Sequence, residues 1–377
     1  MRPRMIGRYF AVFTFVFTTA MSTAYATKVY VSPGGNDTSG NGTIASPYRT
    51  IPKGIAEAST GDTVFALPGT YTGSIVMEDQ IAIVGSGFET TVIDGNGATA
   101  IVTAATALIE GFTIRDGETA ILYDGNSSVS VKSNYITECY YGIDGYIPFE
   151  EGPITPDIRN NIFETILWGI NLDEQAFANG GVNGTIENNT FISAVGAQFN
   201  TGIRYRMHKS IPIIRANSIS GCKTGIEFTY LTIFDQRKLL VSCNNVWDNG
   251  SNYWTEDSTD LTGFQNNISE DPQYCDVASG NWGVYSTSPN APENNACGIL
   301  LGAKGVGCTA VCGDANGSGG ISISDAVFVI SYIFGGGPAP HPLSAGDANC
   351  SGGISISDAV YVINHIFGGG PAPCSSC

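Results

Sequence analysis

The last part of the sequence contains one oxygen-rich cassette twice, and its residue types and spacing suit a hard cation. The copies read GDANGSGGISISDAV from Gly313 and GDANCSGGISISDAV from Gly346. Oxygen-bearing side chains recur at loop positions 1, 3, 5, 9 and 12, and a glycine carbonyl stands at position 7. The two ligand sets are Asp314, Asn316, Ser318, Gly320, Ser322 and Asp325, and Asp347, Asn349, Ser351, Gly353, Ser355 and Asp358. Because Ca2+ takes six to eight oxygen ligands from a loop of this length, each copy predicts a calcium site.

The segments that follow the two loops make the cassette resemble a type I dockerin. SDAVFVISYIF and SDAVYVINHIF begin at Ser324 and Ser357, where a Ser-Asp pair is a helix-starting signal, and each ends at a run of glycines and a proline. The resemblance covers about residues 312–374. It implies bound Ca2+ and docking onto a cohesin-like or cell-surface protein. The alternative is a glycine-rich helical pair that binds no metal.

The resemblance also singles out positions within each loop. In dockerins the two residues before position 12 help to select the partner, and here they are Ile323 and Ser324 in one copy and Ile356 and Ser357 in the other. Position 5 is commonly Asp in the family, whereas this chain has Ser in both copies. Since each loop then carries two carboxylates instead of three, we expect weaker calcium binding than in a typical dockerin.

Residues 1–26 predict a signal peptide. Arg2, Arg4 and Arg8 precede an apolar run, and Ala24-Tyr25-Ala26 has the small residues of a cleavage site. The run is too short to span a bilayer comfortably, and no later segment is apolar enough for a membrane span. We therefore expect a protein that is secreted or held at the cell surface.

The charge and the cysteines are consistent with export. The chain of 377 residues has a formal net charge of −17, which disfavours nucleic acid and anionic membranes as partners. Its ten cysteines, most of them after residue 242, predict disulfide bonds. Spacing does not give their pairing. A Cys312–Cys374 bond that joins the ends of the dockerin-like unit is one option.

Residues 27–308 repeat short strand-like runs at a nearly constant period. Runs rich in Ile, Val, Thr and Phe alternate with Gly, Asn and Asp, and one helix-like stretch begins near Ile51. Asparagines mark the later runs, with gaps of 27, 28, 28, 28 and 22 residues, at Asn134, Asn161, Asn189, Asn217, Asn245 and Asn267. This period predicts a solenoid whose stacked coils bury a shared apolar face, with the asparagines in a ladder of amide hydrogen bonds. A β-sandwich with accidental asparagine spacing is the alternative.

The repeat resembles the right-handed parallel β-helix of the pectin-lyase-like superfamily. Gly-Ile pairs recur at Gly142, Gly169, Gly202 and Gly225, and the opening segment resembles the strand, capping helix and first coil of secreted bacterial members. Relatives often have Cys where this chain has Asn290. The predicted fold class is therefore all-β: a right-handed parallel β-helix over residues 27–308, followed by a small helical double calcium-loop domain over residues 312–374. The resemblance indicates the fold rather than the activity, because lyases, hydrolases and binding proteins share it.

The residues that follow the Gly-Ile pairs are the best candidates for carbohydrate chemistry. They are Asp144, Asn171, Arg204 and Glu227. If each Ile points inward, its successor points outward, because side chains alternate along a strand. We therefore expect an outward column that could bind a sugar chain, with Asp144, Arg204 and Glu227 as candidate catalytic residues. The alternative is a solvated face with ordinary charge variety.

A basic segment and several aromatic residues add weaker hints. Arg204, Arg206 and His208 alternate in GIRYRMHK, which would suit an acidic polysaccharide or simply balance nearby carboxylates. Those carboxylates are Asp173, Glu174 and Glu227. Aromatic residues that could stack on sugar rings or pack laterally are Tyr140, Tyr141, Trp168, Tyr205, Trp247, Trp254 and Trp282.

Specific enzyme signatures are missing from the sequence. We find neither the blocks of polygalacturonase-type hydrolases nor those of pectate lyases, and Asp144 and Glu227 lie too many coils apart for a glycosidase pair. The sequence predicts a carbohydrate-associated protein in polysaccharide binding or breakdown, attached through a calcium-binding tail. A polysaccharide lyase or glycoside hydrolase, and a non-catalytic structural solenoid, remain as alternatives.

Overall fold

The computed structural model describes residues 26–374 except 104–105, 124–126, 148–153, 165, 175–181, 194–199, 207–211, 230–239 and 257. The predicted signal peptide therefore lies almost wholly outside the described residues. None of the helices in the described part of the chain is long and apolar enough to cross a membrane.

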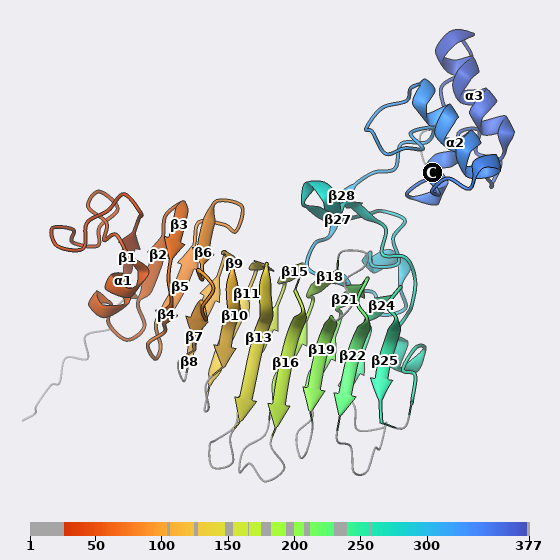
Figure 1. Cartoon of the computed structure of the whole chain (residues 1–377). Helices are drawn as coiled ribbons and strands as arrows, with labels where there is room; N and C mark the ends of the chain where they lie inside the picture. The colour runs from red at the N-terminus through yellow and green to blue at the C-terminus, as the bar shows by residue number, and fades with distance from the viewer. Residues whose placement is uncertain are drawn as a thin grey trace, which may run out of the picture.

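Most of the described strands form three parallel sheets, whose neighbouring strands come from successive turns of the chain (Figure 1). Sheet 1 contains β1 (Lys28–Val31), β2 (Thr63–Ala66), β5 (Ala82–Gly85), β8 (Thr106–Glu110), β11 (Ser128–Lys132), β14 (Asp157–Arg159), β17 (Thr185–Glu187), β20 (Ile213–Arg215) and β23 (Leu240–Ser242). Sheet 2 contains β4 (Ile75–Val76), β7 (Ile101–Val102), β10 (Gly117–Tyr123), β13 (Cys139–Ile147), β16 (Trp168–Glu174), β19 (Thr201–Arg206), β22 (Thr224–Thr229) and β25 (Ser251–Thr255). Sheet 3 contains β3 (Gly69–Thr72), β6 (Thr91–Asp94), β9 (Thr113–Arg115), β12 (Tyr135–Thr137), β15 (Ile162–Glu164), β18 (Thr190–Ile192), β21 (Ser218–Ser220) and β24 (Asn245–Trp247). From β2 onward, each coil passes through sheets 1, 3 and 2 in turn, which is the predicted parallel β-helix.

A short helix covers the start of the solenoid, as the sequence predicts. Helix α1 (Ile51–Glu57) begins after Thr50, whose side-chain oxygen accepts a hydrogen bond from the Lys53 amide at 3.2 Å. Ile51 and Ile55 are buried, and α1 packs against β1 and β2. The helix therefore shields the apolar interior of the first coil from water.

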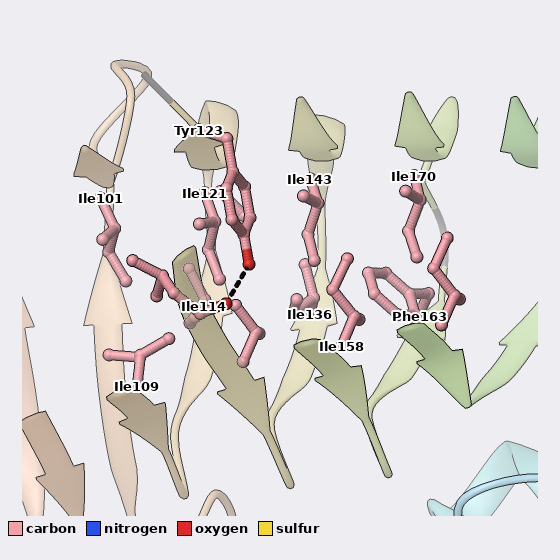
Figure 2. Close-up of a cluster of buried hydrophobic side chains, with 14 of the residues drawn as sticks. Ile101, Ile109, Ile114, Ile121, Tyr123, Ile136, Ile143, Ile158, Phe163 and Ile170 are labelled. Carbon is pink, nitrogen blue, oxygen red and sulfur yellow. Dashed lines mark hydrogen bonds between the residues drawn. The ribbon is translucent and has the colours of Figure 1, made fainter. Parts of the chain in front are cut away.

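Inward-facing isoleucines run through the solenoid in rows, one from each coil. On sheet 2, Ile121, Ile143 and Ile170 are register partners on successive strands (Figure 2), and Ile203 continues the row. All four side chains are fully buried. Burial of such a side chain is worth about 1.5–3 kcal/mol relative to leaving it exposed. The coils are therefore held together by a continuous apolar core that no single coil could form.

The glycine of each Gly-Ile pair allows adjacent coils to approach closely. A Cβ atom on Gly142 would lie 2.5 Å from the carbonyl oxygen of Gly169, and one on Gly169 would lie 2.4 Å from the carbonyl oxygen of Gly202. Any side chain there would collide with backbone. The recurring glycine is thus a packing requirement, independent of any role of the residue that follows the isoleucine.

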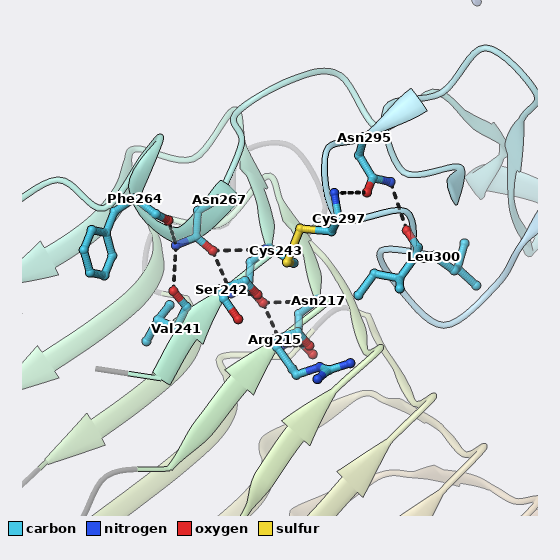
Figure 3. The surroundings of a disulfide bond; sticks show 12 residues. Arg215, Asn217, Val241, Ser242, Cys243, Phe264, Asn267, Asn295, Cys297 and Leu300 are labelled. Carbon is cyan, nitrogen blue, oxygen red and sulfur yellow. Dashed lines mark hydrogen bonds between the residues drawn. A yellow bond between two sulfur atoms is a disulfide. The ribbon is translucent and has the colours of Figure 1, made fainter. Parts of the chain in front are cut away.

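A buried asparagine ladder runs along the turn between sheets 1 and 3. Its members are Asn134, Asn161, Asn189, Asn217, Asn244 and Asn267. The Oδ1 atom of Asn189 accepts bonds from both the backbone amide and the side-chain Nδ2 of Asn161, each at 3.0 Å, and this pattern repeats along the ladder. Each Nδ2 also donates to a backbone carbonyl, as Asn267 does to Val241 at the C-terminal end of the ladder (Figure 3). The amides therefore satisfy backbone groups that the turns would otherwise leave unpaired.

The prediction of Asn245 as a member of the ladder is wrong. Asn244, and not Asn245, occupies the inward position, because Asn244 is the residue two before the buried Val246. Asn245 points the other way, and its Nδ2 donates to the Asn290 side chain at 2.7 Å and to the Glu270 carbonyl at 2.8 Å. Asn290 thus ties the C-terminal segment to the solenoid by hydrogen bonds.

The residue before each of the six ladder asparagines has a left-handed backbone, with φ between +53° and +59°. These residues are Ser133, Asn160, Asn188, Ala216, Cys243 and Asn266. Such a conformation is uncommon for residues other than glycine. The same sharp turn therefore recurs in each coil and directs the next asparagine inward.

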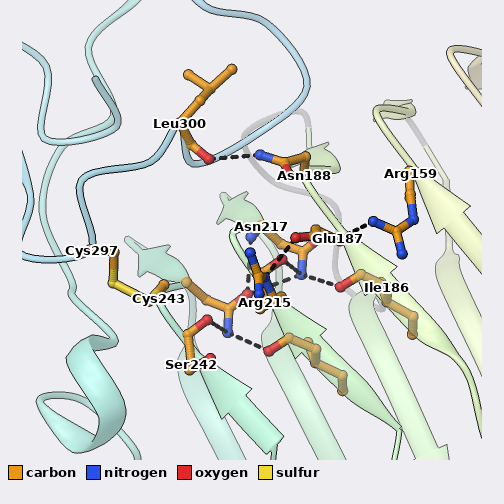
Figure 4. A network of polar contacts seen from close by, with 12 residues as sticks. Arg159, Ile186, Glu187, Asn188, Arg215, Asn217, Ser242, Cys243, Cys297 and Leu300 are labelled. Atoms are coloured by element: carbon orange, nitrogen blue, oxygen red, sulfur yellow. Dashed lines mark hydrogen bonds and ion pairs between the residues drawn. A yellow bond between two sulfur atoms is a disulfide. The ribbon is translucent and has the colours of Figure 1, made fainter. Parts of the chain in front are cut away.

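Charged side chains on the outer face of sheet 1 also pair between coils. The Glu187 carboxylate forms ion pairs with Arg159 and with Arg215, the latter at 2.6 Å (Figure 4). Next to it, Asn188 donates to the Leu300 carbonyl at 2.6 Å, which attaches the C-terminal segment to the coil.

The C-terminal segment of the first domain folds back on the solenoid as a small terminal sheet. This sheet contains β26 (Tyr274–Asp276), β27 (Asn281–Tyr285) and β28 (Val306–Cys308). Three short 3-10 helices lie in the same part of the chain: η2 (Phe264–Asn266), η3 (Val277–Ser279) and η4 (Pro292–Asn294). A fourth, η5 (Leu343–Gly346), lies in the C-terminal domain. Disulfides Cys243–Cys297 and Cys275–Cys308 anchor this segment.

The cysteines do not all pair as suggested from the sequence. Cys374 is bonded to Cys350, so the Cys312–Cys374 option is wrong, although the Sγ atoms of all three lie within 4.8 Å of one another. Cys350 occupies position 4 of the second calcium loop, which brings it beside the C-terminal end of the domain. Cys139 and Cys222 are buried free thiols.

Candidate functional site

The predicted outward column lies on sheet 2. Asp144 of β13 is the register partner of Asn171 of β16, which pairs with Arg204 of β19, which in turn pairs with Glu227 of β22. The next partner is Trp254 of β25, which the sequence interpretation did not place in the column. The coil of Trp254 has Asn252-Tyr253 where the other coils have Gly-Ile. The sequence pattern that located the other residues of the column is therefore absent from this coil.

Polar contacts connect the members of the column. Asn171 Nδ2 donates to Asp144 Oδ1 at 2.7 Å, and Arg204 Nη1 reaches Asn171 Oδ1 at 3.4 Å. Arg204 Nε lies 3.3 Å from Glu227 Oε1. The guanidinium also lies over the Trp168 ring, 5.1 Å from its centroid, a distance suited to a cation–π contact. The four side chains are therefore held in fixed positions along the solenoid axis.

Asp144 is the member of the column with the most perturbed acidity. Burial raises the pKa of its carboxyl, the hydrogen bond from Asn171 opposes this, and the nearby Asp173 charge raises the pKa further. A carboxyl in this environment holds its proton to higher pH than an exposed one. Such a group is a candidate general acid, although structural sites also perturb acidity.

The basic segment is balanced by carboxylates in the described residues. Arg204 pairs with Glu227, and Arg206 Nη1 lies 2.8 Å from Asp173 Oδ2 on the adjacent strand. This supports the charge-balance interpretation of the two arginines. His208 lies outside the described residues, as does the side chain of Glu174.

The aromatic candidates divide between the face of sheet 2 and the interior. Tyr140 and Trp254 are 49% and 43% exposed, and Tyr141 stacks on Trp168 with ring centroids 6.4 Å apart. Tyr205 is fully buried, and Trp282 packs against sheet 3 instead. Exposed rings therefore lie near both ends of the polar column, Tyr140 on the strand of Asp144 and Trp254 beyond Glu227.

The candidate calcium loops are built alike. The Asp314 carboxylate accepts hydrogen bonds from the Ser318 amide at 2.9 Å and the Gly319 amide at 2.7 Å, and Gly319 has a φ of +86° at the sharp turn. Asp325, which is fully buried, accepts from the Asn316 amide at 3.1 Å, so the end of the loop is tied to its start. Asp347 and Asp358 make the equivalent contacts in the second loop: Asp347 with Ser351 and Gly352, and Asp358 with Asn349.

These residues fit a calcium ion. The carboxylates at positions 1 and 12 are both oriented by the loop's own amides, so their remaining oxygen lone pairs are available to a cation. The other predicted ligands, Asn316, Ser318, Gly320 and Ser322, with Asn349, Ser351, Gly353 and Ser355, lie within the same loops. Bound Ca2+ would supply the positive charge that balances the two carboxylates of each loop.

Each loop leads into a helix that begins one residue earlier than the sequence suggests. Helix α2 (Ile323–Gly335) starts after Ser322, and α3 (Ile356–Phe367) after Ser355, and both form a capping box with the Asp at position 12. Thus Asp325 and Asp358 serve as both predicted ligand and helix cap. The buried Ala326, Val329 and Val362 form the contact between the helices.

The predicted partner-selecting residues are accessible on both helices. Ile323 and Ile356 are 46% and 47% exposed, and Ser324 and Ser357 accept hydrogen bonds from Asn316 and Asn349. The two copies therefore present nearly the same surface.

The family model of the dockerin type I domain matches residues 312–367. The C-terminal domain is a type I dockerin. The match confirms the predicted resemblance of this domain to a type I dockerin, and dockerins bind cohesins.

Comparisons of the whole chain are less informative. A search of curated proteins found no match. Among solved structures, pectin methylesterase PemA from Erwinia chrysanthemi is similar at 13% identity and a TM-score of 0.29, over 54% of this chain and 67% of that one. A rhamnogalacturonan lyase is similar at 12% identity and a TM-score of 0.23, over 76% of this chain and 64% of that one, which is less than two thirds of its length. At these TM-scores neither likeness carries an argument about activity.

Proposed function

We propose that this protein is a dockerin-borne polysaccharide-binding protein, exported by its N-terminal signal and attached through its dockerin to a cohesin-like or cell-surface partner. The observation that carries the proposal is the outward column on sheet 2. Its acid, amide and base offer both donors and acceptors to sugar hydroxyls, and the exposed rings of Tyr140 and Trp254 lie near its two ends. In this proposal the boundaries are residues 27–308 for the solenoid and 312–374 for the dockerin.

The geometry of the column suits an extended chain molecule. Adjacent strands lie about 4.8 Å apart, so the side chains from Asp144 to Trp254 form a line along the solenoid axis. Their mutual hydrogen bonds fix them before any ligand arrives, which lowers the cost of ordering them on binding. A linear polysaccharide laid along the axis would meet each in turn.

The test is retention of the purified chain on immobilised acidic and neutral polysaccharides, with calcium and with chelator. Arg204→Ala should lose most of the retention on the glycan that binds. Arg215→Ala is a matched control, because Arg215 is also an outward arginine paired with a glutamate of the neighbouring coil, but on sheet 1. Equal retention by the two variants would contradict binding at sheet 2, and lack of retention of the unaltered chain would leave a structural solenoid.

A second candidate function is polysaccharide cleavage by a lyase or hydrolase mechanism. It is favoured by the half-buried Asp144, whose raised pKa suits an acid or base, with Arg204 two strands further along the same face. Glu227 is three strands away, about 14 Å at ordinary strand spacing, which exceeds the separation of glycosidase carboxylates. Asp173, on the strand adjacent to Asp144, is the nearer second carboxylate.

Product assays separate the two candidates. Release of unsaturated products, read by ultraviolet absorbance, would establish a lyase, and new reducing ends without absorbance would establish a hydrolase. Asp144→Asn should then abolish product release while leaving retention on the glycan largely intact. Retention with no product from the unaltered chain would exclude the enzyme.

A further inference from the structure

A groove with a volume of about 330 Å³ lies away from sheet 2, where the turn between β5 and β6 meets the terminal sheet. Phe88 and Glu89 of the turn form one side, and Trp282, Lys304 and Gly305 form the other. The rim is rich in glycine, so backbone polar groups are accessible there. The groove therefore combines aromatic carbon, one cation, one carboxylate and exposed backbone.

The floor of this groove is fixed by a small polar network. The indole Nε1 of Trp282 donates to Glu164 Oε2 at 3.2 Å, and the Tyr135 hydroxyl donates to the same oxygen at 2.9 Å. The Trp282 ring lies 4.8 Å from Tyr135 and 6.1 Å from Phe88, measured between ring centroids. Both ring orientations are thus set by a shared acceptor, and the surface is preorganised.

The access to Trp282 depends on a glycine. Gly280 has a φ of +78°, and a Cβ atom there would stand 3.4 Å from the Cη2 atom of the indole. A larger residue at this position would cover the ring edge that now faces the groove. Trp282 is 8% exposed and contributes only this ring edge, so the partly exposed Phe88 offers most of the apolar contact that the face of a sugar ring requires.

Lys304 supplies the positive charge of this groove. Its Nζ lies 4.5 Å from the centroid of the Phe88 ring, and among the described residues no carboxylate stands within ion-pair distance of it. Lys53 and Lys132, by contrast, both pair with carboxylates. In a chain with a net charge of −17, a lysine held over an aromatic ring, with no carboxylate partner among the described residues, would favour an anionic ligand.

We propose that this groove is a second glycan-binding site, which takes a uronic-acid residue of an acidic polysaccharide. The carboxylate of the sugar would pair with Lys304, its ring would lie against Phe88 and the edge of Trp282, and Glu89 would accept from its hydroxyls. The groove shares its class of ligand with the proposed function but none of its residues with the sheet 2 column. Two such sites on one chain would increase the avidity for a long polymer.

The experiment uses polygalacturonate and its fully methyl-esterified form, which differ in the carboxylate charge. Lys304→Met should weaken binding of polygalacturonate about tenfold and leave binding of the ester unchanged, because a charge-assisted contact is lost. Lys28→Met is the matched control, since Lys28 lies over Phe65 on sheet 1 at 4.7 Å, and it should change neither. Equal binding by Lys304→Met and the unaltered chain would overturn the proposal.

A second measurement does not depend on the stability of a variant. Acetylation of the unaltered chain, read by mass spectrometry, should be slowed at Lys304 by polygalacturonate and not by the ester, whereas Lys28 should react equally in both. An unchanged rate at Lys304 would overturn the proposal. If Arg204→Ala weakens binding and Lys304→Met does not, the proposed function stands and this inference is refuted. If Lys304→Met weakens binding and Arg204→Ala does not, this inference stands and binding at the sheet 2 column is refuted.

Discussion

The solenoid and the dockerin are both built from repeats, yet the repeats meet different physical needs. A solenoid coil turns its repeated residues inward, where Asn161 and Ile170 contact their counterparts in the next coil. A dockerin copy turns its repeated oxygens toward its own loop, and Ile323 and Ile356 face solvent. Repeated residues therefore mark contacts between stacked coils in the solenoid, and ligand or partner binding in the dockerin. The burial of the repeated side chains distinguishes the two cases.

The largest expected effect is on the asparagine ladder. Asn161→Asp should lower the free energy of unfolding by about 4 kcal/mol, because a buried carboxylate would face the carbonyls of Val131 and Arg159, which now accept from the Asn161 amide. Asn160→Asp, the same change one residue earlier at an exposed position, should cost little. Chemical denaturation of both variants checks this, and similar losses would mean that the ladder does not dominate the stability of the coil.

The next effect contrasts isoleucines in the two regions. Ile170→Ala should cost about 3 kcal/mol, since Ile170 is fully buried between coils. Ile356→Ala, at 47% exposure, should change stability by less than about 0.5 kcal/mol.

The same exposed position allows a binding test. Because the two copies present nearly the same surface, partner binding should survive Ile323→Asp or Ile356→Asp alone and fail in the double variant, as measured by calorimetry with a cohesin. Loss of binding in one single variant would show that the copies are not equivalent.

A smaller effect is expected in the calcium loops. Asp325→Asn removes one of two carboxylates in the first loop and should weaken its calcium binding at least about tenfold, or roughly 1.4 kcal/mol. The second loop serves as the internal control, so calorimetric titration should show one site weakened and one retained. A uniform loss at both sites would indicate that the variant had unfolded the domain.

The smallest effect concerns pH and Asp144. Burial raises the pKa of this carboxyl above its ordinary value of 3.8, so the folded chain binds the proton more tightly than the unfolded chain. The contribution of Asp144 to stability is therefore fully present at low pH and falls as the pH rises from about 4 through the raised pKa. Asp144→Asn should thus gain stability relative to the unaltered chain on going from pH 3 to pH 7, by less than about 1 kcal/mol because the group is partly exposed. Thermal unfolding at both pH values checks this, and a difference independent of pH would contradict it.

Several elements could be predicted because local sequence is sufficient to specify them. The calcium loops, their helices and the capping helix near Ile51 depend on residues close together in the chain. The column from Asp144 to Glu227 was also predictable, because the Gly-Ile pairs fix the register of each strand. Its extension to Trp254 was not, since that coil lacks the pair.

By itself, the sequence determined the period of the coils, the all-β solenoid and the double loop, because repeated spacing and side-chain alternation require only local rules. Tertiary structure alone decided which of two adjacent asparagines, Asn244 or Asn245, enters the ladder and which cysteine bonds to Cys374. It also decided that Trp282 and Lys304 contact Phe88, from which they are separated by 194 and 216 residues in the sequence. These contacts depend on how the C-terminal segment folds back over earlier coils, and no spacing within one coil records that path.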